Sequence, residues 1–454
     1  MNRWIMIMGP LLALVLFTAL LGQGWERAPA ITAAVTLWCA IWWIFEPIPI
    51  PFTSMLPLAL FPLLGVLDAT QVAHAYGNSL VLLLLGGFMI AEALAESGAH
   101  RRMALMMVNL FGGNSARALV LGFMAASALL SMWISNTATT LMLLPVALAI
   151  LAHAQKNLAV PLLLGIAYAA SIGGIGTPIG TPPNLIFMQV YADNFGVSPN
   201  FTQWMSWGLP VVVLMVPVAG LWLTRGLKLE SPVNLPVVGA WQPAEKRVVW
   251  MFAITALLWM TRKEPWGGWS GWLNLPGAND AAVAMLSVVA MAVTPNGKGA
   301  RLLTWDAARK IPWGVLILFG GGIAIASAFV ESGLADHIAQ QLNGLAKLPV
   351  WLIILAICLA VTFLTEVTSN TATSTLLMPM LAAASVVMGV DPTLLMVPAA
   401  MSASCAFMLP VATPPNAVVF GSQQVTIKAM ARAGLVLNLA GALIITLVIW
   451  LRIA

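Results

Sequence analysis

The sequence predicts an all-α polytopic membrane protein, because its composition, its long apolar runs and its internal repeat all point to that class. Of its 454 residues, 61% are hydrophobic and only 8% are charged, whereas soluble proteins carry about 25% charged residues. The mean hydropathy of +0.95 is an average over the whole chain, so the apolar residues are not confined to one anchor. Too few polar residues remain to cover soluble domains, which excludes soluble enzymes, nucleic-acid binders and disordered proteins.

Charge and cysteine content are consistent with this class. The net charge of +5 is typical of the positive-inside bias of membrane proteins, in which Lys and Arg gather in cytoplasmic loops. The three cysteines, Cys39, Cys358 and Cys405, lie in apolar runs without CxxC or Cys/His spacing. This pattern argues against a disulfide framework and against a structural zinc site.

Transmembrane helices need roughly 17–25 mostly apolar residues. We expect about eleven of them, near residues 5–22, 29–46, 54–68, 78–96, 159–191, 206–224, 248–262, 279–294, 311–330, 393–427 and 433–451. Two further apolar stretches, 118–152 and 349–386, are each interrupted in the middle by a polar Ser-Asn-Thr cluster. A single helix of that length would overshoot the membrane, so we interpret both stretches as re-entrant hairpins.

The basic residues predict the orientation. With the N-terminus inside, most Lys and Arg residues fall in cytoplasmic segments, and few fall outside. The positive-inside rule therefore favours a cytoplasmic N-terminus and an external C-terminus, in a multi-pass protein of the cell membrane.

An internal repeat divides the chain. The segment Ser135–Thr139 recurs as Ser369–Thr373, and Thr181–Asn184 recurs as Thr413–Asn416. The expected crossings place the two copies in opposite orientations, which is the inverted-topology arrangement of secondary transporters. We therefore expect N-terminal helices (1–77), a first repeat (78–205, with hairpin 118–152 and broken helix 159–191), connecting helices (206–310), a second repeat (311–430, with hairpin 349–386 and broken helix 393–427) and a last helix (431–454).

The repeated motifs offer hydroxyls, amide groups and backbone carbonyls but no histidine or cysteine. Consecutive prolines in Thr181–Asn184 and Thr413–Asn416 should unwind each span at its centre and free backbone polar groups. Hard oxygen ligands suit an alkali cation such as Na⁺ better than zinc or copper. Asn and Ser/Thr donors can bind carboxylates, and bound cations would supply the positive charge that a dianion needs.

Glu366 is the one charged residue in these motifs. Its counterpart in the first repeat is Met132, so it does not belong to the symmetric machinery. An intramembrane carboxylate is a candidate functional group, and proton coupling and helix capping are alternatives. We favour a structural role as a hydrogen-bond acceptor.

Together, the two Ser-Asn-Thr motifs and the two Thr-Pro-Pro-Asn segments resemble those of the divalent anion–sodium symporters, over essentially the whole chain. The resemblance implies a homodimer in which a transport domain moves against a scaffold domain as an elevator. It also implies two sodium sites, formed by Ser131, Ser135, Asn136 and Gly180, and by Thr365, Thr368, Asn370 and Ala412. Substrate carboxylates would contact Ser135, Asn136, Thr137, Ser369, Asn370 and Thr371, with Thr181, Thr413 and Pro414 nearby.

The function that follows is Na⁺-coupled symport of a C4-dicarboxylate such as succinate, malate or fumarate. A sodium-independent exchanger is the alternative, and a cationic side chain would then replace the metal. No Lys, Arg or His occurs in 131–139, 172–184, 365–373 or 405–416, which favours symport. The motifs do not separate dicarboxylates from sulfate or citrate. No catalytic constellation and no phosphate-binding GxxxxGK[ST] loop is evident, so we expect neither an enzyme nor an ATP-driven pump. The expected partners are the dianion, Na⁺ and membrane lipid, not nucleic acid.

Overall fold

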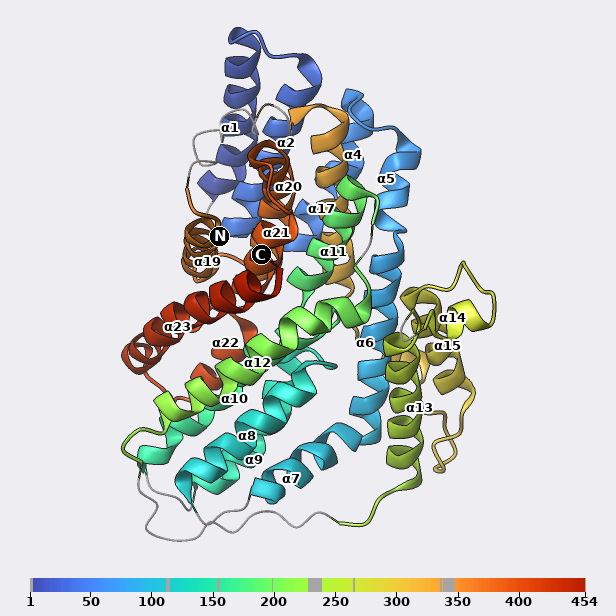
Figure 1. Ribbon diagram of the computed structural model, residues 1–454, viewed down its shortest axis with the longest axis vertical. Helices are drawn as coiled ribbons and strands as arrows, with labels where there is room; N and C mark the ends of the chain where they lie inside the picture. Colours follow the sequence, from blue (N-terminus) through green and yellow to red (C-terminus); the bar gives the residue numbers. More distant parts are fainter. Residues whose placement is uncertain are drawn as a thin grey trace.

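The computed structural model describes residues 3–111, 115–152, 156–197, 199–227, 239–263, 266–334, 337 and 348–453. These residues form helices and contain no named β-strand (Figure 1). Eight segments among them are long and apolar enough to cross a membrane: Trp4–Gly22, Arg27–Phe45, Ala69–Ser97, Ala159–Gly176, Phe201–Leu223, Trp313–Glu331, Asn370–Met388 and Ile427–Ile453. The protein is therefore an all-helical, multi-pass membrane protein.

The N-terminal part packs as a group of helices ahead of the first repeated motif. Asp68 begins the last of them with a reciprocal capping box, in which its carboxylate accepts from Gln71 N at 2.7 Å. Such a cap satisfies N–H groups that a helix start leaves without partners. These elements are α1 (Arg3–Gly22), α2 (Arg27–Phe45), α3 (Ile50–Thr53), α4 (Leu56–Leu64) and α5 (Ala69–Tyr76).

The first set of motif-bearing helices contains two interruptions. One separates α8 from α9 at residues 132–135, and the other precedes α11 at residues 177–181. The elements are α6 (Ser79–Ser97), α7 (Ala99–Phe111), α8 (Ala116–Ser131), α9 (Asn136–Leu151), the 3₁₀ turn η1 (Lys156–Leu158), α10 (Ala159–Gly173), the 3₁₀ turn η2 (Gly174–Gly176) and α11 (Pro182–Phe195).

The second set repeats this pattern. Both α8 and α19 have 16 residues, and they begin at residues 116 and 350, an offset of 234. The interruptions fall at residues 366–369 and 403–413. The elements are α17 (Trp313–Glu331), α19 (Val350–Thr365), α20 (Asn370–Met388), α21 (Thr393–Ser402), α22 (Pro414–Gly421) and α23 (Ile427–Ile453).

Between the two sets lie α12 (Phe201–Leu223), α13 (Pro243–Met260), α14 (Gly268–Trp272), α15 (Asp280–Val293) and α16 (Trp305–Ala308). In Figure 1, α13, α14 and α15 lie to one side of α6, and both α13 and α15 pack against it. Helix α12 instead packs against both α10 and α23.

The helix boundaries correct three details of the sequence interpretation. The expected spans near 54–68, 279–294 and 393–427 consist of shorter helices, and α20, expected as half of a hairpin, is itself long enough to cross a membrane. The broken helices extend to residues 195 and 421 instead of 191 and 427. Helix α7 was missed because charged and polar residues interrupt its apolar positions.

The prolines begin helices instead of lying in the unwound segments. Pro182 and Pro414 occupy the first turns of α11 and α22, where their missing N–H groups cost nothing. The residues before them, Thr181 (φ −149°, ψ 144°) and Thr413 (φ −140°, ψ 150°), are extended, because a following proline disfavours the α conformation. The unwinding therefore precedes the prolines.

The two sets of helices pack against each other across the molecule. Helix α9 contacts α22, and α11 contacts α20. Each helix that begins with Asn-Thr-Ala-Thr therefore packs against a Pro-Pro-Asn helix of the other set.

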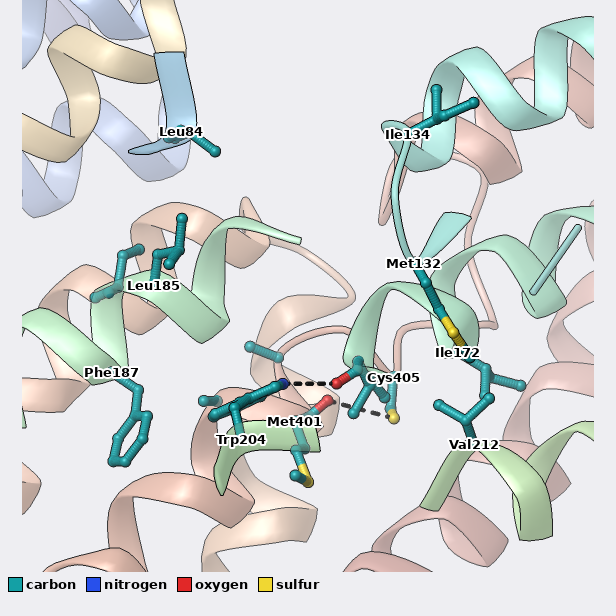
Figure 2. Close-up of a cluster of buried hydrophobic side chains, with 14 of the residues drawn as sticks. Leu84, Met132, Ile134, Ile172, Leu185, Phe187, Trp204, Val212, Met401 and Cys405 are labelled. Atoms are coloured by element: carbon teal, nitrogen blue, oxygen red, sulfur yellow. Dashed lines mark hydrogen bonds between the residues drawn. The ribbon is translucent and has the colours of Figure 1, made fainter. Parts of the chain in front are cut away.

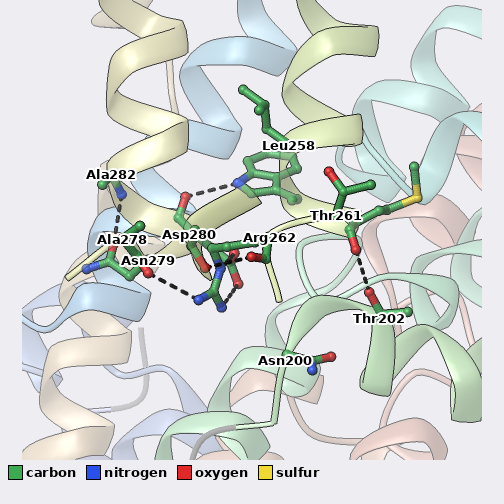
Figure 3. A network of polar contacts seen from close by, with 12 residues as sticks. Asn200, Thr202, Leu258, Thr261, Arg262, Ala278, Asn279, Asp280 and Ala282 are labelled. Carbon is green, nitrogen blue, oxygen red and sulfur yellow. Dashed lines mark hydrogen bonds and ion pairs between the residues drawn. The ribbon is translucent and has the colours of Figure 1, made fainter. Parts of the chain in front are cut away.

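A nearly buried ion pair joins the end of α13 to the start of α15. Arg262 Nε lies 2.5 Å from Asp280 Oδ1, with both side chains about one-tenth exposed. Arg262 also donates to the Ala278 carbonyl at 3.2 Å, and Trp259 Nε1 donates to the Asp280 carbonyl at 2.9 Å (Figure 3). Because the Arg262 guanidinium is largely removed from water, it depends on Asp280 for compensation.

We predict that Asp280→Ala lowers the stability of the folded protein by about 3 kcal/mol, because removal of one partner leaves a buried charge uncompensated. Thermal unfolding of the detergent-purified protein measures the effect. Asp306→Ala is the matched control, because its ion pair with Arg309 is exposed, with side-chain exposures of 88% and 68%. Equal unfolding temperatures for both variants would contradict a stabilising role for the Arg262–Asp280 pair.

Candidate functional site

The breaks between α8 and α9 and between α19 and α20 each place a hydroxyl group against an asparagine amide. Ser131 Oγ donates to Asn136 Oδ1 at 2.6 Å, and Thr365 Oγ1 donates to Asn370 Oδ1 at 2.7 Å. Each pair joins the last residue of one helix to the first residue of the next. The accepted hydrogen bond fixes the rotation of each amide and leaves its oxygen a second lone pair.

Backbone carbonyls approach the first pair closely because two glycines lack side chains. A methyl group added at Gly174 would lie 2.8 Å from Asn136 Oδ1, and one added at Gly180 would lie 2.5 Å from the Gly174 carbonyl oxygen. Both distances are shorter than any tolerable carbon contact, so these positions require glycine. The unwound segment thereby brings backbone oxygen atoms next to Asn136.

The second pair has a comparable surrounding built from different residues. Thr365 Oγ1 lies 3.1 Å from the carbonyl oxygen of Ala403, the first residue after α21. Thr368 Oγ1 lies 2.6 Å from Thr373 Oγ1. Ala412 is buried in the same unwound segment, and its N–H donates to the Leu409 carbonyl at 3.2 Å.

The asparagine of each Thr-Pro-Pro-Asn motif holds the unwound segment before it. Asn184 Nδ2 donates to the carbonyls of Gly174 and Thr177 at 2.9 and 2.8 Å. Asn416 Nδ2 donates to the carbonyls of Ala406 and Leu409 at 3.1 and 3.0 Å.

These two asparagines also leave buried oxygens without partners. Both side chains are fully buried, and among the described residues neither Oδ1 atom has a hydrogen-bond partner. An unpaired buried acceptor is costly unless a donor or a cation satisfies it. Each repeat thus has a buried amide oxygen that is free to accept a hydrogen bond or to bind a cation.

Glu366 binds the unwound backbone of the second repeat. Its Oε1 accepts from the N–H groups of Phe407 and Met408 at 2.8 and 2.9 Å, and its Oε2 accepts from Leu409 N at 3.0 Å. Asn438 Nδ2, from α23, donates to the same Oε1 at 2.7 Å. This side chain is only 4% exposed, so it satisfies three consecutive backbone donors that no helix satisfies, which is the structural role that we favoured.

The first repeat holds the corresponding segment without a carboxylate. At the counterpart of Glu366, the Met132 carbonyl accepts a hydrogen bond from Thr177 Oγ1, and the Met132 side chain packs near Gly176. Figure 2 shows Trp204, on α12, directed at the backbone, where its Nε1 donates to the Ile175 carbonyl at 2.8 Å. The backbone therefore follows a similar path in the two repeats, but different side chains hold it in place.

The expected metal ligands that are not also expected substrate contacts are buried: Ser131, Gly180, Thr365, Thr368 and Ala412. The remaining expected metal ligands lie at the starts of α9 and α20. The residues there are half-buried in both repeats: Ser135, Asn136, Thr137, Ser369, Asn370 and Thr371. The hydroxyl and amide groups of these residues can therefore contact a ligand that enters from outside the packed helices.

Some expected site residues have local structural tasks. Ser135 Oγ caps α9 by accepting from Ala138 N at 3.2 Å, and Thr413 Oγ1 caps α22 by accepting from Asn416 N at 3.3 Å. Thr181 is buried and lies at the N-cap of α11, whereas Pro414 is exposed at the start of α22.

Sequence reasoning missed five residues that contact these helix breaks. Gly174 and the carbonyl of Ala403 approach the hydroxyl–amide pairs, and nothing in their residue types marked them. Asn184 and Asn416 belong to the repeated motif and were left without a role, although their recurrence was a usable signal. Asn438, a lone amide in an apolar run, was a second such signal.

Comparison with known proteins supports the class that this fold and site define. The sequence model of the citrate transporter family (CitMHS) matches residues 40–394. Sodium-dependent dicarboxylate transporters SdcS from Staphylococcus aureus strains USA300 and bovine RF122 / ET3-1 are 40% and 41% identical to this chain over 471 residues. The alignments cover 98% of this chain and 90% of each relative.

Two solved transporters share the fold. The YdaH transporter of Alcanivorax borkumensis gives a TM-score of 0.58 at 16% identity, covering 84% of this chain and 87% of its own. MtrF of Neisseria gonorrhoeae gives 0.60 at 14% identity, covering 84% and 83%. The protein is thus an integral membrane transporter and not an enzyme. It belongs to the divalent anion–sodium symporter family, which confirms the family that the repeated motifs predicted.

We predict that Glu366→Gln lowers stability by about 2 kcal/mol, because the amide nitrogen that replaces one carboxylate oxygen faces N–H donors and hydrogen bonds to a charged group are lost. Thermal unfolding measures the stability. Transport by this variant should fall by the same factor at pH 6 and pH 8 and remain dependent on sodium, because a structural acceptor carries no proton.

Met132→Gln is the control for this variant, because it places the same amide at the equivalent position of the first repeat. Met132→Gln should leave the hydrogen bonds between Glu366 and the backbone of residues 407–409 intact. A loss of transport in Glu366→Gln that changes strongly between pH 6 and pH 8 would instead support proton coupling through Glu366.

Proposed function

We propose that this protein is a Na⁺-coupled symporter of C4-dicarboxylates such as succinate, malate and fumarate. The observation that carries the proposal is the pair of matched hydroxyl–amide contacts, Ser131–Asn136 and Thr365–Asn370. Each lies at a helix break beside an unwound backbone, which is how secondary transporters build midplane sites for ions and substrates. The names of the full-length relatives, sodium-dependent dicarboxylate transporters, point to the same function.

Sodium would bind at two related sites. Ser131, Ser135, Asn136 and the Gly180 carbonyl form one ligand set, and Thr365, Thr368, Asn370 and the Ala412 carbonyl form the other. All of these ligands are neutral oxygens, which suit a hard monovalent cation. The burial of Ser131 and Thr365 removes competing water, and the close backbone approach at Gly174 and Gly180 provides carbonyl ligands.

The dicarboxylate would bind between the half-buried hairpin tips. Hydroxyl and amide groups of Ser135, Asn136 and Thr137 would donate to one carboxylate, and those of Ser369, Asn370 and Thr371 to the other. Thr181, Thr413 and Pro414 would border the site at the starts of α11 and α22. Because these groups carry no charge, bound sodium ions would supply the compensation for a dianion, which couples the two ligands.

A sodium-independent exchanger is the second candidate. It would need a cationic side chain at the tips, and none occurs in 131–139, 172–184, 365–373 or 405–416. Sulfate or citrate could replace the dicarboxylate without changing the donor types, so substrate choice within the divalent anions is settled by competition experiments.

The same proposal includes the transport architecture. The α8–α9 and α19–α20 pairs would be re-entrant hairpins of two inverted repeats, within an elevator whose scaffold includes the N-terminal helices. The protein would act as a homodimer in the bacterial inner membrane, with its N-terminus in the cytoplasm and its C-terminus outside. The hydroxyl–amide pairs would then lie at the membrane midplane.

Asn136→Ala and Asn370→Ala should each reduce sodium-driven succinate uptake at least about tenfold, because loss of a group that contacts a charged ligand costs about 1.5–3 kcal/mol. Uptake into proteoliposomes measures the loss, and size-exclusion chromatography checks folding. Asn194→Ala is the control, because within the part of the chain that the structure describes its amide donates to the Val190 carbonyl of its own helix. Normal uptake by both tip variants would contradict the site.

Wild-type protein in proteoliposomes should take up radiolabelled succinate only with an inward Na⁺ gradient. The dependence on sodium concentration should be sigmoidal if both sites fill before transport. Uptake that is independent of sodium but requires dicarboxylate inside the proteoliposomes would identify an exchanger. That result would contradict the proposed sodium sites. Competition by malate, citrate and sulfate then ranks the anions.

A further inference from the structure

A basic cavity lies apart from the motif breaks, where the start of α10, the end of α12 and the start of α23 meet. Its volume is about 460 Å³, and its lining includes Pro161, Trp222, Arg225, Thr426, Lys428 and Arg432. At a rise of 1.5 Å per residue, Pro161 lies roughly 20 Å along α10 from the break before α11. The cavity is therefore separate from the site proposed above, and its size is in the range of small-ligand sites.

Three cationic side chains surround this cavity, and no described carboxylate pairs with them. Arg225, Lys428 and Arg432 are exposed, and none of them takes part in the ion pairs of the described residues. The lining residues include no Asp or Glu. Three uncompensated cations around one concavity attract an anion.

Local structure holds two parts of this surface in place. The Arg225 guanidinium carbon lies 3.1 Å from the centroid of the Trp222 ring, a cation–π contact that fixes the side chain at the mouth of the cavity. Thr426 Oγ1 accepts from Ala429 N at 3.2 Å and so caps the start of α23. The positive end of the α23 dipole adds to the charge of Lys428.

The remaining lining is apolar, and the cavity lies at the ends of two candidate membrane spans. Val160, Leu223 and Ala433 contribute apolar surface, and the spans Phe201–Leu223 and Ile427–Ile453 begin or end beside it. Tryptophans such as Trp222 are typical of the membrane–water interface. A ligand here would meet positive charge on one side and apolar surface on the other.

We propose that this cavity binds the phosphate headgroup of an anionic phospholipid. Basic pockets between transmembrane helices are established headgroup sites, and the mixed lining suits an amphiphile better than a freely soluble anion. The cations would contact the phosphate, and the apolar residues would border the start of the acyl chains. The assignment does not depend on which solute the protein transports.

Native mass spectrometry of the detergent-purified full chain, with equal amounts of phosphatidylglycerol and phosphatidylcholine, tests the proposal. Wild-type protein should retain phosphatidylglycerol preferentially. The double variant Arg225→Gln/Arg432→Gln should lose about fivefold in occupancy for each cation removed. The double variant Lys428→Gln/Arg432→Gln should also lose phosphatidylglycerol occupancy. The test therefore does not depend on a single pair of substitutions.

Arg101→Gln/Arg117→Gln is the charge-matched control, because both arginines are exposed and lie outside the cavity. It should retain the wild-type preference. Unchanged phosphatidylglycerol binding in both cavity variants, or an equal loss in the control, would overturn the proposal. Displacement of the lipid by millimolar succinate or inorganic phosphate would assign the cavity to a free anion and also overturn it.

Discussion

The structure depends on satisfying the backbone polar groups of two interrupted helices inside an apolar protein. A helix break exposes N–H and C=O groups that membrane lipid cannot satisfy. Here side chains from neighbouring elements provide the partners, and two of them, Asn184 and Asn416, recur in both repeats. The same broken backbone exposes the carbonyl oxygens that the proposed sodium sites would use, so the stability of the break and the proposed function share one origin.

The two repeats meet this requirement by different means. The second uses one buried carboxylate, Glu366, which accepts from three successive N–H groups and from Asn438. The first uses Trp204 and Thr177, which donate to backbone carbonyls. The carboxylate satisfies backbone N–H groups, whereas Trp204 and Thr177 satisfy backbone carbonyls in addition to those that Asn184 holds. Two sites related by duplication therefore need not have equal affinity for an ion, because their electrostatic surroundings differ.

Contacts between the repeats join helices that carry distant motifs. Helix α9 packs on α22, and α11 packs on α20, so each helix that begins with Asn-Thr-Ala-Thr borders a Pro-Pro-Asn helix of the other repeat. Movement of one repeat alone would break these contacts. Such contacts favour joint movement of the motif-bearing helices, which the proposed elevator would require. The basic cavity lies at the far ends of α10, α12 and α23, where a lipid would contact this same group of helices without occupying its centre.

The amino-acid sequence alone predicted the membrane class, the family and the positions of the four motifs. These follow from composition and from recurrence of short segments, which are visible without coordinates. It also predicted an interruption at each Ser-Asn-Thr cluster, because polar residues interrupt apolar runs there, and the helices do end beside these clusters. Only the tertiary structure decided that the prolines begin helices, that Glu366 binds residues 407–409, and that Gly174 lies against Asn136. Periodicity reports on neighbours along one helix, whereas these contacts join residues that are brought together only when separate helices pack.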